Sequence, residues 1–202
     1  MSLVEIWGWV CGIASGLSAL PQLARLLKAR TSAGLSLLSW QLNAGVLWGW
    51  TAHGVLTMRH NLIWSNLFLA CSMSAVVALI VQDRRLSWAR SLAPLLALFA
   101  ALLVIEWNFG EVVFGLVVVG PGAFALVAQF VDLLRRPDLS GVSLPALAVN
   151  AAVQIMWFSW ANLAGDRAVQ LVSTCIGLCA LGNVAAYLGR WRGWLRPRGL
   201  TG

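Results

Sequence analysis

Amides and indoles recur at helical spacing inside two of the chain's long apolar segments. Asn150, Gln154 and Trp157 follow one another at intervals of four and three residues, which places them on one face of a helix. Asn43 and Trp50 make a similar stripe earlier in the chain. An indole beside an amide suits a sugar-like neutral solute, because apolar C–H faces stack on the ring while hydroxyls meet hydrogen-bond donors and acceptors.

Groups that carry catalysis or bind metals are scarce in the same segments. The apolar segments contain no nucleophile–base set, no cluster of metal ligands and no phosphate loop. The four cysteines lie inside apolar runs without paired loop spacing, so we expect neither a disulfide framework nor a zinc site. We therefore expect no enzyme activity, no cofactor and no metal.

The composition excludes an ordinary water-soluble domain. Of 202 residues, 60% are hydrophobic and 10% are charged, whereas soluble domains carry about 25% charged residues. The net charge of +7 is scattered between apolar runs, so no nucleic-acid partner is expected. A membrane helix needs about 20 apolar residues. We predict seven spans in the lipid bilayer, at 3–27, 37–58, 62–81, 92–107, 111–134, 144–163 and 168–188.

The loops predict an orientation. Twelve of the fourteen Lys and Arg residues lie on one side of the predicted spans, and only Arg59 and Arg167 lie on the other. Because basic residues are retained in the cytoplasm, we expect the N-terminus outside and the C-terminus inside. The preference for Arg over Lys and the short loops fit a bacterial inner membrane. The acidic residues expected on the outer side are Glu5, Glu106, Glu111 and Asp166.

An internal repeat relates two parts of the chain. Residues 21–79 align without a gap on residues 128–186, an offset of 107, with thirteen identities in 59 positions. The informative matches are Gln22/Gln129, Asn43/Asn150 and Trp50/Trp157. We therefore predict two parallel three-helix repeats joined by a connector helix. Their predicted bounds are 1–81 for the first repeat, 82–110 for the connector, 111–188 for the second repeat and 189–202 for a basic tail.

The segment PQLARLLKARTSAGLSLLSW, which begins at Pro21, resembles a PQ-loop. It has a Pro-Gln pair near the inner end of a span, a short basic loop and a Gly-Leu-Ser-Leu-Leu start to the next span. The segment AQFVDLLRRPDLSGVSLPAL is a degenerate copy, with Ala128 in place of the proline. With its 3+1+3 plan, the whole chain resembles the SWEET and SemiSWEET sugar transporters of the PQ-loop (MtN3/saliva) superfamily. The resemblance implies an all-α membrane carrier for a mono- or disaccharide.

The resemblance also implies a solute site. SWEET-type carriers hold a Trp and Asn pair in these helices, and Trp50 with Asn66 matches that pair in position and spacing. At 1.5 Å per residue, the two lie about 4 Å and about 7 Å outward of the midplane. In the second repeat Trp157 matches, while Ser173 stands where an Asn is expected. Gln154, from the helical stripe, completes the candidate solute-binding set.

Prolines in the first two helices of each repeat are typical of the family, and Pro21 and Pro145 remain here. Pro21 removes an amide donor and weakens its helix near the inner end. We therefore expect an inner gate that bends at these two prolines, beside the motif residues Gln22 and Gln129.

Coupling to protons would need a titratable group along the path. The candidates are His53, one turn outward of Trp50, and Asp132, which Arg135 and Arg136 are near enough to pair with. Because no charged group is expected at mid-membrane, we favour passive alternating access between the two bundles.

Other residues are expected to pack. Trp48 and Trp160 lie outside the two stripes and are interpreted as packing or interfacial residues. The GxxxG pairs Gly12/Gly16 and Gly45/Gly49 are predicted positions of close helix contact.

Two other functions stay open. One is a vitamin or amino-acid carrier on the same plan, with or without proton coupling; the run WFSW, from Trp157 to Trp160, resembles the Trp-x-x-Trp of nicotinamide riboside transporters. The other is a non-transporting receptor, which would be expected to place charged groups in the pocket. Two repeats in one chain make a complete pathway, so a monomer suffices and a homo-oligomer is compatible.

Overall fold

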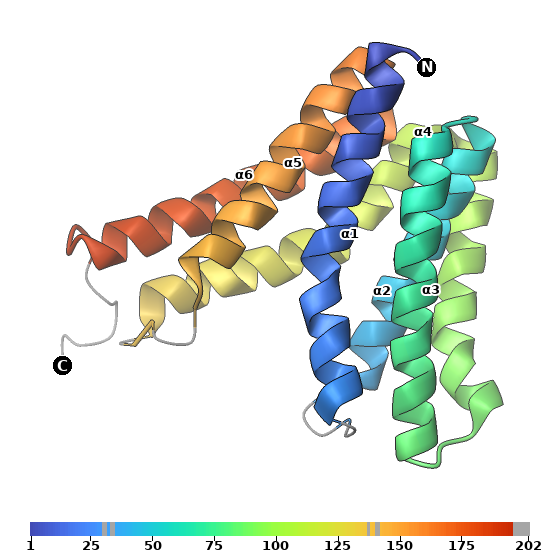
Figure 1. The fold of residues 1–202 in the computed structure, drawn as a ribbon, viewed down its shortest axis with the longest axis horizontal. Helices are drawn as coiled ribbons and strands as arrows, with labels where there is room; N and C mark the ends of the chain where they lie inside the picture. Colours follow the sequence, from blue (N-terminus) through green and yellow to red (C-terminus); the bar gives the residue numbers. More distant parts are fainter. Residues whose placement is uncertain (30–31, 33–34, 137, 140–141, 196–202) are drawn as a thin grey trace. The chain divides into compact units, whose positions relative to one another are not determined.

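The computed structural model describes residues 1–29, 32, 35–136, 138–139 and 142–195, with the side chains of residues 18–29 left outside the description. Within these ranges the chain is helical and has no β-strand. The helices are α1 (Leu3–Ala29), α2 (Leu37–Leu56), α3 (His60–Asp83), α4 (Trp88–Arg135), α5 (Leu144–Ala164) and α6 (Arg167–Trp191) (Figure 1).

Five of the seven predicted spans correspond to separate helices within a few residues. The other two, 92–107 and 111–134, both lie on α4, so the described part of the chain has six helices rather than seven. A break at Gly110, with φ 81° and ψ 176°, interrupts α4 between them. The residues between the two predicted spans are too few for a loop, and a glycine reaches this backbone conformation without steric cost.

Four helices are long and apolar enough to cross a membrane by length and composition: α3, α4, α5 and α6. In α1, the described apolar part is the shorter stretch Leu3–Leu17. Large apolar side chains also lie on the outside of the helices, including Trp107 at 76% exposure and Phe124 at 78%. Helices that present apolar residues outward are suited to lipid rather than to water. The fold is therefore an all-α fold that fits a membrane.

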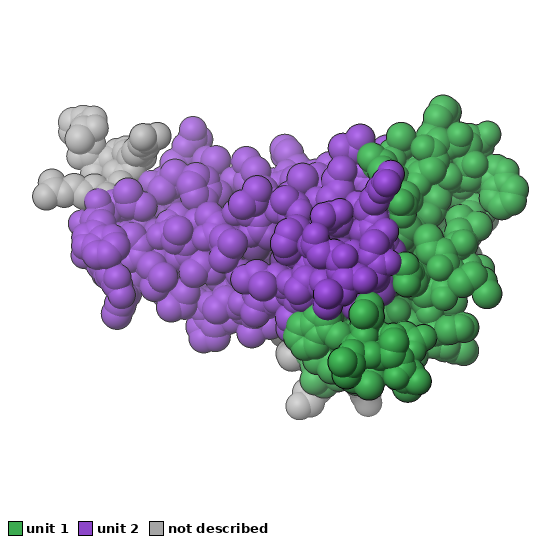
Figure 2. Space-filling view, turned by 90° about the horizontal axis from the view of Figure 1, so that it is seen from above, with its two compact units in different colours: residues 1–114 green, residues 115–202 purple. Residues whose placement is uncertain are grey.

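Two compact units make up the chain, residues 1–114 and residues 115–202 (Figure 2). In unit 1, α3 packs against both α1 and α2. Three of the four glycines predicted at positions of close helix contact are confirmed there, and a Cβ on Gly12 would lie 2.7 Å from Cβ of Ser65 on α3. The prediction is wrong for Gly16, where a Cβ would lie 3.8 Å from the ring of Phe68, which is ordinary contact. On α2, a Cβ on Gly45 would lie 3.0 Å from the carbonyl oxygen of Leu95, and a Cβ on Gly49 would lie 2.8 Å from the side chain of Leu102 on α4.

In unit 2, α5 packs against α6. Leu133 of α4, Leu147 of α5 and Ala186 of α6 form a buried apolar cluster that joins the three helices. The second part of α4 therefore completes a three-helix group with α5 and α6.

The helix boundaries repeat at the offset that the sequence alignment found. Leu37 begins α2 and Leu144 begins α5; His60 begins α3 and Arg167 begins α6, each pair separated by 107 residues. The break at Gly110 lies 107 residues after Leu3, where α1 begins.

The same side chain starts the second helix of each repeat. The Ser36 hydroxyl accepts the Ser39 N–H at 3.3 Å, and the Ser143 hydroxyl accepts the Ala146 N–H at 3.4 Å. A serine in this position satisfies one of the amide donors that a helix leaves unpaired at its start. The serine of the Gly-x-Ser in each of the two loop segments thus has a structural role as a helix cap.

Candidate functional site

Trp50 lies on α2 and is half-buried in unit 1. Its indole meets the ring of Phe114 edge to face, with centroids 5.0 Å apart and planes at 87°. It meets the ring of His53 in the same way, at 5.4 Å and 86°. Edge-to-face contacts are a favoured geometry for aromatic pairs. Neighbours from α2 and α4 therefore set the orientation of this predicted solute-site residue.

His53 completes the aromatic cluster and adds a titratable group. Its ring stacks on that of Phe114, with centroids 5.3 Å apart and planes at 8°, and its side chain is fully buried. Nδ1 of His53 is hydrogen-bonded to Oε1 of Glu106 on α4. A hydrogen bond between these two atoms requires a proton between them, because each atom would otherwise present only a lone pair. Unit 1 thus holds a buried His–Glu pair one helical turn from Trp50.

Glu106 was not among the site residues predicted from the sequence. We expected it among the acidic residues flanking the spans on the outer side, but the structure places it inside α4 with 7% exposure. Leu95, Leu102 and Glu106 are all buried and follow at intervals of seven and four, so Glu106 continues the buried face of the helix. That spacing was the available signal. Oε2 of Glu106 is buried and has no hydrogen-bond partner among the residues that the structure describes.

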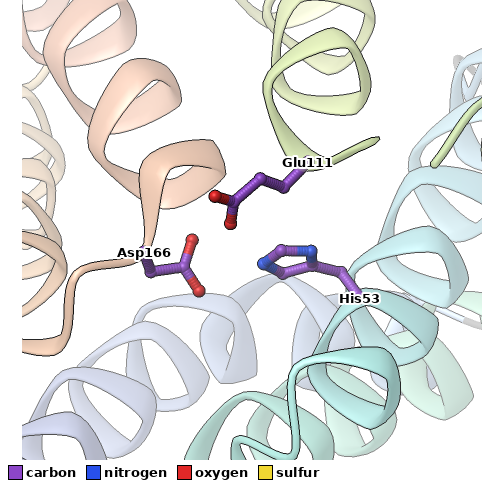
Figure 3. Close-up of side chains that lie close together, drawn as sticks. All are labelled: His53, Glu111 and Asp166. Atoms are coloured by element: carbon purple, nitrogen blue, oxygen red, sulfur yellow. The ribbon is translucent and has the colours of Figure 1, made fainter. Parts of the chain in front are cut away.

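Glu111 is a second carboxylate near His53. A ring nitrogen of His53 and a carboxylate oxygen of Glu111 lie within 4.8 Å of each other, and Figure 3 shows the two side chains pointing toward one another. Glu111 follows the break at Gly110, which begins the second part of α4. The third residue labelled in Figure 3, Asp166, belongs to unit 2, where its carboxylate accepts the Val169 N–H at 2.9 Å and caps α6.

Asn66 lies on α3 in the same unit as Trp50 and is half-buried. Its Nδ2 donates to the carbonyl oxygen of Leu62, one turn earlier, at 2.9 Å. Its side-chain oxygen makes no hydrogen bond with any residue that the structure describes. Asn66 therefore keeps an acceptor for a hydroxyl group, on a helix that packs against the one carrying Trp50.

Unit 2 repeats the ring contact of unit 1 with a different residue. Trp157 is half-buried on α5 and meets Trp160 edge to face, with centroids 5.5 Å apart and planes at 89°. Trp157 and Trp160 lie 107 residues after Trp50 and His53. Trp160 is 1% exposed, which confirms its interpretation as a packing residue. The two repeats thus share an edge-to-face pair, and only the first repeat places a titratable ring in it.

The other two predicted residues of unit 2 lie on α5 and α6 in different surroundings. Ser173 is 3% exposed, and its hydroxyl donates to the carbonyl oxygen of Val169 at 2.6 Å. Gln154 is half-buried, and its Cβ lies 3.4 Å from the position that a Cβ on Gly177 would take. Of this pair, Gln154 is the more exposed and Ser173 the more enclosed.

The predicted gate residues fall in three different settings. The side chains of Pro21 and Gln22 lie outside the described residues, although α1 runs through both positions. Pro145 lies in the first turn of α5. A proline there removes an N–H that has no helical partner and does not kink the helix. Bending at Pro145 would therefore occur between the loop and α5.

Gln129 is held by Asn183, which was not among the predicted site residues. The Asn183 side chain, fully buried on α6, donates from Nδ2 to the Gln129 side-chain oxygen at 3.3 Å and to the carbonyl oxygen of Leu126 at 3.1 Å. These bonds connect α6 to the second part of α4. An Asn in an apolar run is the kind of signal that predicts such an interhelical bond.

Of the two predicted proton-coupling residues, only His53 is buried. Asp132 is exposed, and Arg136 donates to it at 2.7 Å across one turn of α4. Exposed pairs of this kind contribute little and are common on helix surfaces. The pairing anticipated for Asp132 is thus present, and His53 is the residue with a buried carboxylate partner.

The loop after the PQ-like motif is tied to the end of α3. The backbone N–H and the hydroxyl of Ser32 donate to Asp83 Oδ2 at 2.9 Å and 2.6 Å. These two hydrogen bonds hold the pKa of Asp83, which lies beyond the predicted span 62–81, below its ordinary value. Arg84 donates to the carbonyl oxygens of Ser32 and Leu35, each at 2.7 Å. Nothing in the spacing of the sequence indicated this cluster.

A comparison of the chain with protein-family models finds no match, and a search of curated proteins finds no similar protein.

Proposed function

We propose that the chain is a membrane transporter that moves a small neutral solute, with a mono- or disaccharide favoured, by passive alternating access between two three-helix bundles. The proposal includes seven spans counted across the break at Gly110, an outside N-terminus, a cytoplasmic C-terminus and a bacterial inner membrane. The PQ-like segment that begins at Pro21 supports it by resemblance to SWEET-type carriers.

One observation carries the proposal: the two repeats place an indole in the same ring geometry. Trp50 and Trp157 are both half-buried, and each meets a ring three residues later edge to face, at 5.4 Å and 5.5 Å between centroids. The helices that carry them begin at equivalent residues and are capped by equivalent serines. A carrier built from two such bundles needs matched solute-binding surfaces, and a repeated half-buried indole supplies them.

The polar groups beside the indoles favour a neutral solute. Asn66 offers an amide oxygen and Gln154 offers an amide, both half-buried. Neutral amides and indoles match the hydroxyls and C–H faces of a sugar. An anion would require a basic group at the same depth, and the basic residues are predicted at the ends of the spans.

A second candidate is a vitamin or amino-acid carrier with proton coupling. The buried pair of His53 and Glu106 favours it, because ionisable residues within membrane helices mark proton or ion pathways. Stacking of a flat vitamin between Trp157 and Trp160 is disfavoured, since these rings contact each other edge to face and Trp160 is buried.

Counterflow of labelled glucose into proteoliposomes without a proton gradient tests the proposal. We expect uptake by the wild-type protein, and a loss of about tenfold or more in Asn66→Ala and in Trp157→Ala, as removal of roughly 1.4 kcal/mol of binding would give. Asn108→Ala is the matched control for the amide, because Asn108 makes the same bond to the preceding turn, at 2.8 Å, but is exposed. Trp64→Ala is the control for the indole, with 56% exposure.

Three outcomes contradict parts of the proposal. No glucose uptake by the wild-type protein, followed by uptake of a vitamin or amino acid in the same liposomes, would replace the sugar with that solute. Uptake that survives both variants would place the solute elsewhere. Equal losses in the variants and their controls would indicate general damage to the fold.

A further inference from the structure

The buried pair of His53 and Glu106 is unusual in a protein whose helices fit a membrane, because ionisable residues are rare in membrane helices. His53 is fully buried and Glu106 is 7% exposed, and the two lie on different helices, 53 residues apart in the chain. Burying ionisable groups costs free energy that hydrophobic residues of similar size would not cost. Packing alone does not require them, since Trp160 fills the equivalent place beside Trp157 in the second repeat.

The pair is built to hold a proton. The contact between His53 Nδ1 and Glu106 Oε1 contains one proton, shared between base and acid. Oε2 of Glu106 is buried without a hydrogen-bond partner among the described residues, so this oxygen can receive a further proton without breaking a bond. A proton can bind at this closely packed pair because, unlike a larger ligand, it needs no cavity.

The charge of the pair acts on Trp50. The His53 ring meets the Trp50 indole edge to face, with centroids 5.4 Å apart, and stacks on the Phe114 ring, with centroids 5.3 Å apart. The rings of Trp50 and Phe114 are also in contact with each other. A charged imidazole interacts with aromatic rings more strongly than a neutral one. Gaining or losing a proton therefore changes the forces that orient the Trp50 indole, and it changes the hydrogen bond that joins α2 to α4.

We propose that His53 and Glu106 form a proton-binding site whose occupancy is thermodynamically linked to solute binding at Trp50. Linkage is reciprocal: if the proton changes the affinity for the solute, the solute changes the affinity for the proton by the same factor. The proton site itself stands on the geometry of unit 1. The linkage rests on the proposed function.

A second carboxylate of unit 1 faces the pair. Glu111, on α4, faces a ring nitrogen of His53 within 4.8 Å. Arg59 lies at the start of α3, and His60, next to it, is exposed. Glu111 is therefore the matched control: a carboxylate on the same helix, close to the same histidine, but not hydrogen-bonded to Nδ1.

Infrared difference spectra test the proton site in the wild-type protein in liposomes. Titration with acid is expected to produce the carbonyl stretch of a buried carboxylic acid that exchanges slowly with deuterium. The band should be absent from Glu106→Gln, present in Glu111→Gln and shifted in its titration midpoint in His53→Gln. Absence of the band from the wild-type protein, or its loss in Glu111→Gln rather than in Glu106→Gln, would overturn the proton site.

Solute binding at several pH values tests the linkage. The half-saturating glucose concentration in counterflow should change by about fivefold or more across the infrared midpoint. The change should vanish in His53→Gln, which removes the ring charge but retains a polar side chain. Transport by the wild-type protein with an unchanged half-saturating concentration would overturn the linkage while leaving the proposed function intact. No transport of any tested solute would overturn the proposed function and the linkage with it, and the infrared band would still decide the proton site.

Discussion

Replacing Gly12 by alanine tests the close approach of α1 to α3. A Cβ on Gly12 would lie 2.7 Å from the Cβ of Ser65 and 3.2 Å from its Oγ. Carbon atoms in ordinary contact are at least about 3.5 Å apart, so the two helices would have to separate locally. Overpacking of this kind costs about 1–3 kcal/mol, and alanine recovers about 0.5–1 kcal/mol over glycine in a helix. The difference between these two ranges is an expected net loss of up to about 2.5 kcal/mol of stability.

Gly16→Ala is the matched control, one turn further along α1. Its new Cβ would lie 3.8 Å from the nearest atoms of Phe68, also on α3, which is ordinary contact. The same substitution on the same helix, facing the same partner, should therefore stabilise by about 0.5–1 kcal/mol. The two substitutions are expected to change stability in opposite directions because the new Cβ has about one ångström more room at Gly16 than at Gly12.

Unfolding of the purified protein in mild-detergent micelles by titration with sodium dodecyl sulfate, followed by circular dichroism, measures both variants. A second substitution, Ser65→Gly, removes the Cβ that Gly12→Ala would strike, so the double variant should recover stability beyond the sum of the single effects. If Gly12→Ala and Gly16→Ala change stability equally, or if Ser65→Gly gives no recovery, the packing of α1 on α3 at Gly12 is not as the structure has it.

Two further predictions concern the helix starts and the loop after α1. Ser36→Ala and Ser143→Ala should each lower stability by about 1 kcal/mol, while the serine-to-threonine variants should not, as measured in the same detergent titration. For Asp83, the native hydrogen bonds from Ser32 lower the pKa, so the stability they add is present above its ordinary value of 3.8 and is lost as the pH falls through the lowered pKa. The difference in stability between wild type and Asp83→Asn should therefore shrink on acidification; a difference that stays constant would contradict this assignment.

Most of the helical plan could be predicted from the sequence because each signal is local. Apolar length marked the spans, and the Gly-x-Ser segments marked the starts of α2 and α5, where Ser36 and Ser143 cap the helices. The exception is the break at Gly110. The sequence predicted two spans with a connection between them, whereas a single glycine with positive φ is enough to interrupt α4.

The candidate site was predictable only where repetition supplied a second signal. Trp50 and Trp157 stood out because they recur at a fixed offset and share a helical stripe. Glu106 did not, because its role depends on contact with His53 across 53 residues of chain, and the sequence offers no local sign of that pairing. Contacts of this kind depend on how α2 packs against α4, here through Gly45 and Gly49.

The position occupied by His53 in the first repeat and by Trp160 in the second has a structural role in both repeats and a chemical role in the first. His53 and Trp160 occupy equivalent places, and both present a ring edge-to-face with an indole, at nearly equal distances and angles. A contact retained with two different residue types is a requirement of packing, which either ring meets. The ability to hold a proton is retained only in the first repeat, and it comes with a carboxylate, Glu106, on the helix between the repeats, where the alignment has no counterpart. The proton-binding chemistry is therefore an addition to the repeated framework, placed beside the indole of Trp50.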